Sequence, residues 1–390
     1  MSVDRSALMH TYPEPPVTFA RGQGTLLWDT DNRRYLDFLG GLAVTSLGHS
    51  HPVVAEALAE QARTLLHVSN LFGNTVGPEV AATIDRLIGG GERAGGQVFL
   101  ANSGAEANEC AIKLARRWAG SGRHVVITAW DSFHGRTLAT LHATGQPAKH
   151  EPFAPLPEGF EHVPYDDLDA LEAACNPTRV AAVLLEAIQG EAGVIVPSSD
   201  YLAGARALCS ERGILLMVDE VQTGLGRTGR WFGYEHTGVE PDVVTLAKAL
   251  GNGVPIGACW AKAEVAAAFG PGDHGSTFGG QPLAAAAARA TLAVMESENV
   301  PMLAERAGAR LSAGLSALPG IASVRGAGLL LAAEVRGGIA QGVVDAALRR
   351  GLVLNAPRPD SIRFAPPLLV ADGEIDEALD ILADAIEEIA

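Results

Sequence analysis

Residues 214–251 read ILLMVDEVQTGLGRTGRWFGYEHTGVEPDVVTLAKALG and contain two apolar runs, each ending in a reactive side chain. The first run, 214–218, leads into Asp219, and the second, 243–247, leads into Lys248. Short apolar runs of this kind are typical of buried strands. Because parallel strands bring their carboxyl ends to one edge of a sheet, we expect the Asp219 carboxylate and the Lys248 amine to converge there.

Lysine is an uncommon residue in this chain. The sequence has 29 Lys and Arg residues, of which four are lysines: Lys113, Lys149, Lys248 and Lys262. Arginine keeps its proton in proteins, whereas a desolvated lysine can lose it. A neutral lysine amine is the nucleophile that forms a Schiff base with an aldehyde. The second apolar run therefore indicates amine chemistry at its end.

Two nucleotide-binding interpretations of the same stretch are weaker. Residues 224–229, GLGRTG, match G-x-G-x-x-G, which in dinucleotide sites joins a strand directly to a helix. Here residues 219–223 intervene, and an aromatic, glycine-broken segment follows, so a NAD-dependent oxidoreductase is only an alternative. The acid-ended strand also suits a phosphate-loop enzyme, but no lysine of the chain follows a glycine as that motif requires. We expect 224–229 to form a loop near the substrate mouth.

The composition excludes several classes of function. The chain has 390 residues and a net charge of −16, which argues against binding nucleic acid through its phosphates. The four cysteines form no C-x-x-C, so neither a disulfide framework nor a zinc site is indicated. His49, His51 and His134 lack further ligands nearby in the sequence, and we expect them to be structural. The first residues lack the apolar core of a signal peptide, and no apolar run is long enough to span a membrane. We expect a soluble cytoplasmic protein.

The order of apolar and helical segments predicts an α/β fold in two parts. Between 97 and 247, strand-like runs alternate with helical segments, which is typical of a mostly parallel sheet covered on both faces. No helix fits between the runs 243–247 and 256–260, so we expect that pair to be antiparallel and the sheet to be mixed. Residues 25–39 predict a β-hairpin after an irregular arm. The domains expected are 1–60, joining the small domain, 61–284, the large domain, and 285–390, the small domain.

The segment before the helix predicted for 105–119 has the features of an anion site. Asn102, Ser103, Gly104 and Ala105 connect it to the strand 97–101. Free backbone N–H groups and the helix dipole favour a phosphate there. A phosphorylated cofactor that forms a Schiff base with lysine is pyridoxal phosphate, whose ring nitrogen needs an anionic partner such as Asp219.

The residues that carry these features resemble the class III aminotransferases that use pyridoxal phosphate, nearly from end to end. The resemblance implies a fold-type I enzyme with a seven-stranded mixed sheet in the large domain and a smaller α+β domain. The matching segments are SLGHSHP (46–52), SNLFGN (69–74), FLANSGAEANECAIKLAR (99–116), SFHGRTLATL (132–141), EAIQGEAGV (186–194), VDEVQTGLGRTG (218–229), LAKALGNGVPIGA (246–258), GSTFGGQPLA (275–284) and IRFAPPL (362–368).

The resemblance also implies which residues hold the cofactor. Lys248 would attach it covalently and move the substrate proton, Asp219 would pair with the ring nitrogen, and Gln222 would bind the ring hydroxyl. Phe133 and Val221 would press on opposite faces of the ring. The remaining cofactor residues implied are Ser103, Gly104 and Ala105 for the phosphate, with Thr277 reaching it from the other subunit of a homodimer.

The implied reaction moves the ω-amino group of N2-acetyl-L-ornithine to 2-oxoglutarate by ping-pong chemistry, as in arginine biosynthesis. Arg136 and Arg363 would bind substrate carboxylates, and Glu191 would cover Arg363 for the ω-amine and swing aside for glutamate. Other substrate-facing residues implied are Tyr12, Asn70 and Ser276. Ornithine, succinylornithine and 4-aminobutyrate remain alternative donors, and a cofactor-free binding protein is an alternative of another class.

The chain departs from the family pattern at three positions. Gln281 stands where asparagine is common, Asn252 where glycine is common, and Ala187 where proline is common. None of these positions carries a catalytic group, so the departures bear on the substrate more than on the class of activity.

Overall fold

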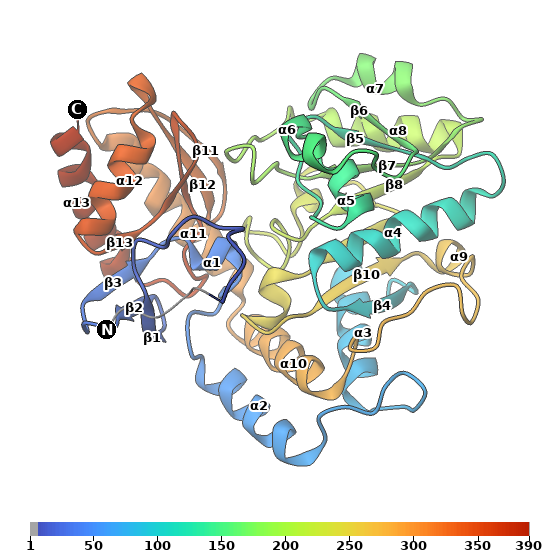
Figure 1. Ribbon diagram of the computed structural model, residues 1–390, viewed down its shortest axis with the longest axis horizontal. Helices are drawn as coiled ribbons and strands as arrows, with labels where there is room; N and C mark the ends of the chain where they lie inside the picture. Colours follow the sequence, from blue (N-terminus) through green and yellow to red (C-terminus); the bar gives the residue numbers. More distant parts are fainter. Residues whose placement is uncertain (1–6, 390) are drawn as a thin grey trace.

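Seven strands form the central sheet of the molecule (Figure 1). The structure is a computed structural model that describes residues 7–389. The central strand pairs are parallel, and the edge pairs with the strand at 257–261 are antiparallel, as predicted. In spatial order the strands are β4 (Gln97–Ala101), β10 (Gly257–Ala261), β9 (Val243–Leu246), β8 (Leu215–Asp219), β7 (Val180–Glu186), β5 (Val125–Ala129) and β6 (Phe160–Val163).

Helices cover both faces of this sheet because its central strands are apolar on both faces. Every residue of β7 and β8 is buried. On one face, Met217 shares an apolar cluster with Ile112 of α4 (Gly104–Ala119). On the other face, Leu216 lies in the same cluster as Tyr201 of α8 (Tyr201–Arg212). The sheet therefore fixes the positions of β8 and β9, whose ends carry Asp219 and Lys248.

Three further helices pack beside the sheet. The helix α10 contacts both α2 and α3. Shorter helices complete this part of the chain. The helices are α1 (Gly40–Ala43), α2 (Pro52–Thr64), α3 (Val76–Ile88), α5 (Leu138–Ala143), α6 (Pro147–His150), α7 (Leu168–Ala174), α9 (Ala263–Ala266) and α10 (Pro282–Ser297).

A second, antiparallel sheet belongs to the C-terminal part of the chain, on the left in Figure 1. Its strands, in spatial order, are β11 (Ile321–Ala327), β12 (Leu330–Val335), β15 (Ser361–Phe364) and β14 (Asn355–Arg358). The helices around it are α11 (Val300–Ala317), α12 (Ala340–Arg349) and α13 (Asp372–Ile389). This arrangement is the predicted smaller α+β unit, with two strands, β11 and β14, that the sequence did not predict.

The N-terminal strands join the C-terminal part. The predicted hairpin is confirmed as β2 (Leu26–Asp29) paired antiparallel with β3 (Arg34–Asp37), and β3 pairs in parallel with β13 (Leu352–Val353). The prediction of an irregular N-terminal arm is wrong for its last residues, because they belong to β1 (Phe19–Gln23), which pairs with β2. The part of that arm at residues 1–6 lies outside the described residues. The β3–β13 pairing supports the division into 1–60 with 285–390 and 61–284, which we propose as the domain organisation.

The segment 224–229, here called the junction loop, lies inside the molecule, so its expected place near the substrate mouth is wrong. Its six residues are buried, and the chain continues into the 3-10 helix η2 (Gly233–Thr237) instead of an α-helix. Arg227 donates to the carbonyl oxygens of Leu329 at 3.1 Å and Pro366 at 2.6 Å. A side chain at Gly328 would meet the Thr228 carbonyl carbon at 2.5 Å. The glycines therefore allow close packing between the two parts of the chain and do not bind a dinucleotide.

Within residues 7–389, no helix combines the length and the apolar character needed to cross a bilayer.

Candidate active site

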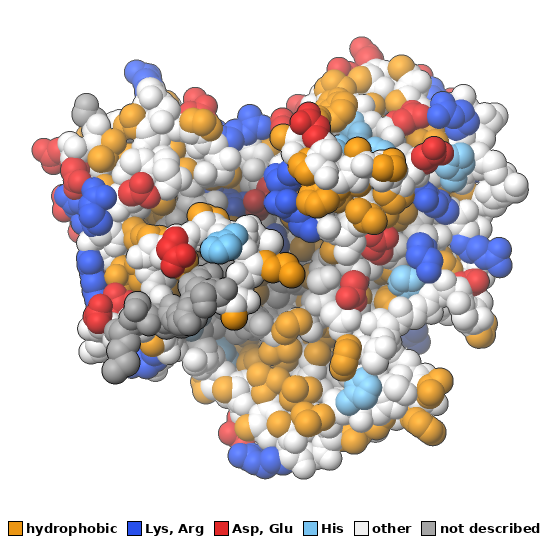
Figure 2. All heavy atoms as spheres, viewed as in Figure 1, with side chains coloured by type: hydrophobic (Ala, Val, Ile, Leu, Met, Phe, Trp, Pro, Cys, Tyr) orange, Lys and Arg blue, Asp and Glu red, His pale blue; other side chains and the backbone are white. Residues whose placement is uncertain are grey.

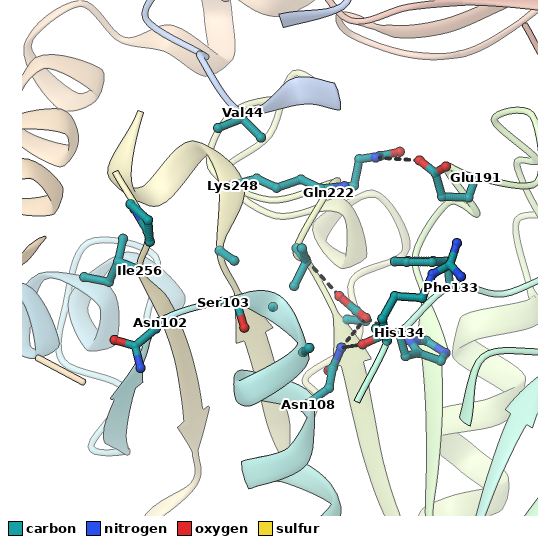
Figure 3. A pocket seen from close by; sticks show the side chains of 18 of the residues that line it. Val44, Asn102, Ser103, Asn108, Phe133, His134, Glu191, Gln222, Lys248 and Ile256 are labelled. Carbon is teal, nitrogen blue, oxygen red and sulfur yellow. Dashed lines mark hydrogen bonds and ion pairs between the residues drawn. The ribbon is translucent and has the colours of Figure 1, made fainter. Parts of the chain in front are cut away.

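A cavity of about 400 Å³ lies where the ends of β8 and β9 meet the start of α4 (Figure 3). Lys248 follows β9 after one residue, Ala247, and begins the 3-10 helix η3 (Lys248–Gly251). Its φ of 39° is left-handed, a conformation that costs energy for a residue with a Cβ and that accompanies functional sites. Burial lowers the pKa of Lys248 to about 8, and Glu191 opposes this shift. The amine is therefore neutral at mildly alkaline pH.

Asp219 lines the same cavity and is held by a buried network. Its Oδ2 accepts a hydrogen bond from Nδ2 of Asn108 at 2.8 Å and pairs with Nδ1 of His134 at 2.8 Å. Its Oδ1 accepts from the backbone N–H of Val221 at 3.0 Å. Thr245 donates to Oδ1 of Asn108 at 2.8 Å, which fixes the amide that serves Asp219. Four neighbours thus set the orientation of one carboxylate.

The N-terminus of α4 lines the cavity with Ser103, Gly104 and Ala105. Ser103 is the N-cap of α4: its backbone is extended, and its hydroxyl accepts a hydrogen bond from the Glu106 N–H at 3.2 Å. A side chain at Gly104 would meet Val221 at 2.9 Å, so only glycine lets the helix end approach the cavity wall. This end of a 16-residue helix is suited to an anion.

Phe133 and Val221 both line the cavity, as the resemblance implies for the two faces of a ring. Phe133 is fixed through its backbone, whose N–H donates to Oε2 of Glu186 at 3.1 Å. Val221 lies against Gly104. An aromatic side chain and a branched aliphatic side chain are suitable walls for a flat, unsaturated ligand.

Arg363 and Glu191 form a buried ion pair beside the cavity. Nη1 of Arg363 lies 2.6 Å from Oε1 of Glu191, and the Arg363 side chain is 1% exposed whereas that of Glu191 is 30% exposed. Nη2 of Arg363 is buried without a hydrogen-bond partner among the described residues. Burial alone raises the pKa of Glu191, but Arg363 reverses this and leaves it below its usual value. In this pair the partly exposed Glu191 side chain has room to move, and Nη2 of Arg363 is a donor that a ligand could use.

Gln222 connects this pair to the cavity. Its Nε2 donates to Oε1 of Glu191 at 3.4 Å, and its Oε1 accepts from Nη1 of Arg363 at 3.3 Å. In Figure 3 the Lys248 side chain extends toward Gln222, whose amide is joined to Glu191. The amide thus lies between the attachment point for a cofactor and the ion pair.

Arg136 also lines the cavity, and its side chain is exposed. Its guanidinium carbon lies 5.6 Å from the centre of the Phe133 ring. Figure 2 shows basic side chains at the margin of the central hollow of the molecule. Arg136 is therefore available to an anionic ligand that enters the cavity.

Five predicted site residues do not line this cavity, and one of them is Arg363, which lies beside it in the pair with Glu191. Tyr12 is 81% exposed and does not line it. Asn70, Ser276 and Thr277 line a different, open hollow. There Asn70 donates to the Ser276 carbonyl at 2.9 Å. The hydroxyl of Ser276 accepts from Asn102, itself a cavity residue, at 3.0 Å, so this hollow adjoins the phosphate end of the site.

The sequence does not assign the roles of three buried groups of the site. His134 was expected to be merely structural, but it contacts Asp219. Asn108 bridges Asp219 and Thr245 from the buried face of α4. Burial raises the pKa of Glu186 to about 7. The only signal for His134 was its place next to Phe133, and Asn108 is an unusual polar residue on the apolar face of its helix.

The three departures from the family pattern occupy supporting positions. Asn252 has a φ of 46°, which asparagine tolerates better than most residues, and it accepts from the Leu47 N–H at 2.8 Å. Gln281 accepts from the Val68 N–H at 2.9 Å and so holds the segment that carries Asn70. Ala187 is buried beside Gly233, where a side chain would meet its Cβ at 2.8 Å. None of the three lines the cavity.

The cavity brings together groups that fit the cofactor implied by the resemblance. A buried amine suits an aldehyde, a hydrogen-bonded carboxylate suits a protonated ring nitrogen, and a helix N-terminus suits a phosphate. The carboxylate and amine stand at neighbouring strand ends, since β8 pairs with β9. The site supplies each of the three contacts from a different structural element.

Comparison with known proteins gives consistent results. The family model described as Aminotransferase class-III matches residues 8–386. The acetylornithine aminotransferase of Gloeobacter violaceus is 52% identical over 96% of this chain and 94% of its own length. That of Corynebacterium efficiens is 48% identical over 98% of this chain and 95% of its own.

Solved structures agree with the fold. Ornithine aminotransferase from Toxoplasma gondii, with pyridoxal phosphate at partial occupancy in its active site, has a TM-score of 0.92 and 38% identity over 99% of this chain and 93% of its own. Acetylornithine aminotransferase from Elizabethkingia anophelis has a TM-score of 0.85 and 34% identity over 98% of this chain and 96% of its own.

Proposed function

The chain belongs to the class-III aminotransferase family, and we propose that it transfers the ω-amino group of N2-acetyl-L-ornithine to 2-oxoglutarate. The products are N-acetylglutamate semialdehyde and glutamate, and the place of the reaction is arginine biosynthesis. Relatives named acetylornithine aminotransferase match nearly the full chain, which supports this donor over ornithine, succinylornithine or 4-aminobutyrate. The observation that carries the proposal is the buried Arg363–Glu191 pair next to Lys248.

The proposed cofactor is pyridoxal 5′-phosphate. Lys248 would attach it covalently, Asp219 would pair with its ring nitrogen, and Gln222 with its ring hydroxyl. The N-terminus of α4 would bind the phosphate through Ser103, Gly104 and Ala105. When bound, the cofactor supplies an electron sink for the bond broken at the substrate carbon and carries the amino group between the two half-reactions.

Lys248 is proposed as the proton carrier. Its Nζ is buried in the cavity, and burial lowers its pKa to about 8. A general base works best when its pKa is near the operating pH, because it is then both available and sufficiently basic. We propose that Nζ takes the proton from the donor carbon and returns it on the other side of the transfer.

Glu191 is proposed as the gate between the two donors. Glutamate presents a carboxylate beside the reacting carbon, and the unused Nη2 of Arg363 can donate to it once Glu191 moves aside. The ω-amine of acetylornithine has no carboxylate at that end, so Glu191 must then stay on Arg363, since an unpaired buried guanidinium is costly. The partial exposure of Glu191 leaves room for that movement.

Arg136 is proposed to bind the carboxylate at the far end of the substrate. That end carries the α-carboxylate of acetylornithine or the γ-carboxylate of glutamate. Arg136 lines the cavity and is exposed, so an entering carboxylate can reach it. Arg363 and Arg136 would bind the two carboxylates of glutamate, and Arg136 alone would bind the single carboxylate of acetylornithine.

We further propose a homodimer that shares its active sites. Three apolar side chains around the second hollow are strongly exposed: Leu71 at 87%, Phe72 at 71% and Phe278 at 65%. Exposed apolar groups gathered around a hollow are typical of an interface. Thr277 lines that hollow and would reach the phosphate of the other copy, while Asn70 and Ser276 would face its substrate, as would Tyr12. Sedimentation velocity on the wild type and on Phe72→Glu tests this, with a monomeric wild type contradicting it.

A cytoplasmic location is proposed on weaker grounds. The four cysteines are free and buried, which suits a reducing compartment.

Two measurements test the proposed function. The visible spectrum of the purified protein, followed by borohydride reduction and peptide mapping, should place the pyridoxyl label on Lys248. Initial rates with acetylornithine, succinylornithine, ornithine and 4-aminobutyrate should then be highest with acetylornithine. A colourless protein, or a label on another lysine, would overturn the aminotransferase chemistry, and a different preferred donor would overturn the substrate.

A further inference from the structure

Lys149 lies next to the candidate active site, and nothing in the mechanism above uses it. It belongs to the short helix α6 and is half-buried. Its Nζ lies 5.9 Å from the centre of the Phe133 ring, and the guanidinium carbon of Arg136 lies 5.6 Å from the same centre. Two cations therefore flank one aromatic ring of the cavity wall.

Neither cation is neutralised. Among residues 7–389, no carboxylate lies within ion-pair distance of Arg136 or Lys149, although the chain carries a net charge of −16. Lys149 donates to the neutral amide oxygen of Gln146. Gln146 in turn donates to the Ser132 carbonyl at 3.0 Å, which ties the lysine to the segment that carries Phe133. The side chain is thus held in place by neutral groups.

The charges around Lys149 also favour the binding of an anion. Burial lowers the pKa of Lys149, the charge of Arg136 lowers it further, and Glu191 opposes both. In this structure Glu191 pairs with Arg363 and not with Lys149. The repulsion between these two like charges raises the free energy of the empty site, and a bound anion lowers that cost.

Contrast with the other lysines supports a special role. Lys262 pairs with Asp242 at 3.0 Å. Lys113 donates to the Asp273 carbonyl at 2.8 Å, well away from the cavity lining. Lys248 lies at the cavity floor. Lys149 is therefore the lysine placed beside the proposed carboxylate-binding arginine.

We propose that Lys149 and Arg136 together form the subsite for the distal carboxylate of both donors, with Lys149 as a specificity-determining residue. This inference rests on the proposed function, since it assigns a second cation to the end of the substrate that Arg136 binds. Lys149 itself is not part of the cavity lining, so it acts from behind Phe133 and Arg136, at the rim. It strengthens the field felt by a carboxylate there and does not contact the reacting atoms.

The test compares two donors that differ by one carboxylate. N-acetylputrescine is N2-acetylornithine without its carboxylate. In Lys149→Met we expect the ratio of kcat/KM for acetylornithine over acetylputrescine to fall about three- to fivefold, the usual size of one partly screened charge contact. Lys149→Arg keeps the charge and should retain the ratio, and Lys113→Met is the matched control that should leave it unchanged.

A binding measurement separates this inference from the proposed function. Calorimetric titration of the holoenzyme with glutarate, an unreactive dicarboxylate, should show weaker binding in Lys149→Met by roughly the same factor. If turnover proceeds but neither the ratio nor glutarate binding changes in Lys149→Met, the subsite is wrong and the proposed function stands. If no donor is turned over yet glutarate binding still weakens, the proposed function is wrong and the subsite stands.

Discussion

Two arginines in this molecule are equally buried but have different kinds of hydrogen-bond partner. Arg363, beside the cavity, and Arg227, in the junction loop, are each 1% exposed. Each has one buried nitrogen without a hydrogen-bond partner among residues 7–389, Nη2 in Arg363 and Nε in Arg227, but Arg363 pairs with the partly exposed carboxylate of Glu191. Arg227 donates to the carbonyl oxygens of Leu329 and Pro366 and to the hydroxyl of Ser46, all fixed by the fold.

The difference lies in what can move. A backbone carbonyl cannot leave its donor without unfolding the segment around it, whereas a side-chain carboxylate can rotate away. Without a countercharge, burial lowers the pKa of Arg227 to about 9. Burial alone therefore does not distinguish a functional arginine from a structural one. The kind of hydrogen-bond partner distinguishes them, since a side-chain carboxylate can move and a backbone carbonyl cannot.

The largest effect is expected from Arg363→Met. Removing the guanidinium leaves the α-carboxylate of glutamate without its partner and Glu191 without a countercharge. We expect kcat/KM for glutamate to fall about 100- to 1000-fold, the cost of truncating one member of a buried charge pair. Stopped-flow half-reactions with glutamate and with acetylornithine measure this. A smaller loss for glutamate than for acetylornithine would contradict the assignment.

Arg227→Met is expected to affect stability and spare catalysis. The change leaves the carbonyls of Leu329 and Pro366 without donors, at a cost of about 3 kcal/mol in the free energy of unfolding. Urea denaturation measures that cost. The KM values for both donors should change by less than about twofold, since the junction loop does not line the cavity. A selective rise in one KM would mean that the loop takes part in substrate binding.

The pH dependence sharpens the same contrast. Lys248 must be neutral to attach the cofactor, and its pKa is about 8. Below that pH the neutral fraction falls about tenfold per unit, so the rate of cofactor attachment to the apoprotein should fall likewise and level off above about pH 8. Absorbance during reconstitution follows this rate. A rate of cofactor attachment that does not change between about pH 6 and about pH 8 would contradict a Lys248 pKa in this range.

Much of the fold was predictable because it depends on local pattern. The runs that became β7, β8 and β9 are mostly apolar and entirely buried, and the lack of space between β9 and β10 predicted their antiparallel pairing correctly. Strands β1 and β6 were missed because their sequences, FARGQ and FEHV, mix charged and apolar residues. Pairing with a neighbour far along the chain decides such strands.

The site was predictable where it coincides with strand ends. Asp219 and Lys248 follow from two apolar runs, but the partners of Asp219 do not, because Asn108 and His134 lie 111 and 85 residues away in the sequence. The junction loop was misplaced because a glycine-rich sequence does not reveal whether tertiary packing will cover it. The roles of Thr277, Asn70, Ser276 and Tyr12 stay predictions, since they require a second copy of the chain.

The gate assigned to Glu191 is the centre of this account, and Glu191→Ala tests it directly. Single-turnover rates of the acetylornithine and glutamate half-reactions should be compared between this variant and the wild type. The account predicts that the acetylornithine-to-glutamate ratio falls by about tenfold or more, because an uncovered Arg363 penalises the ω-amine and favours a carboxylate. A ratio that stays at the wild-type value, with both half-reactions intact, would contradict the gate.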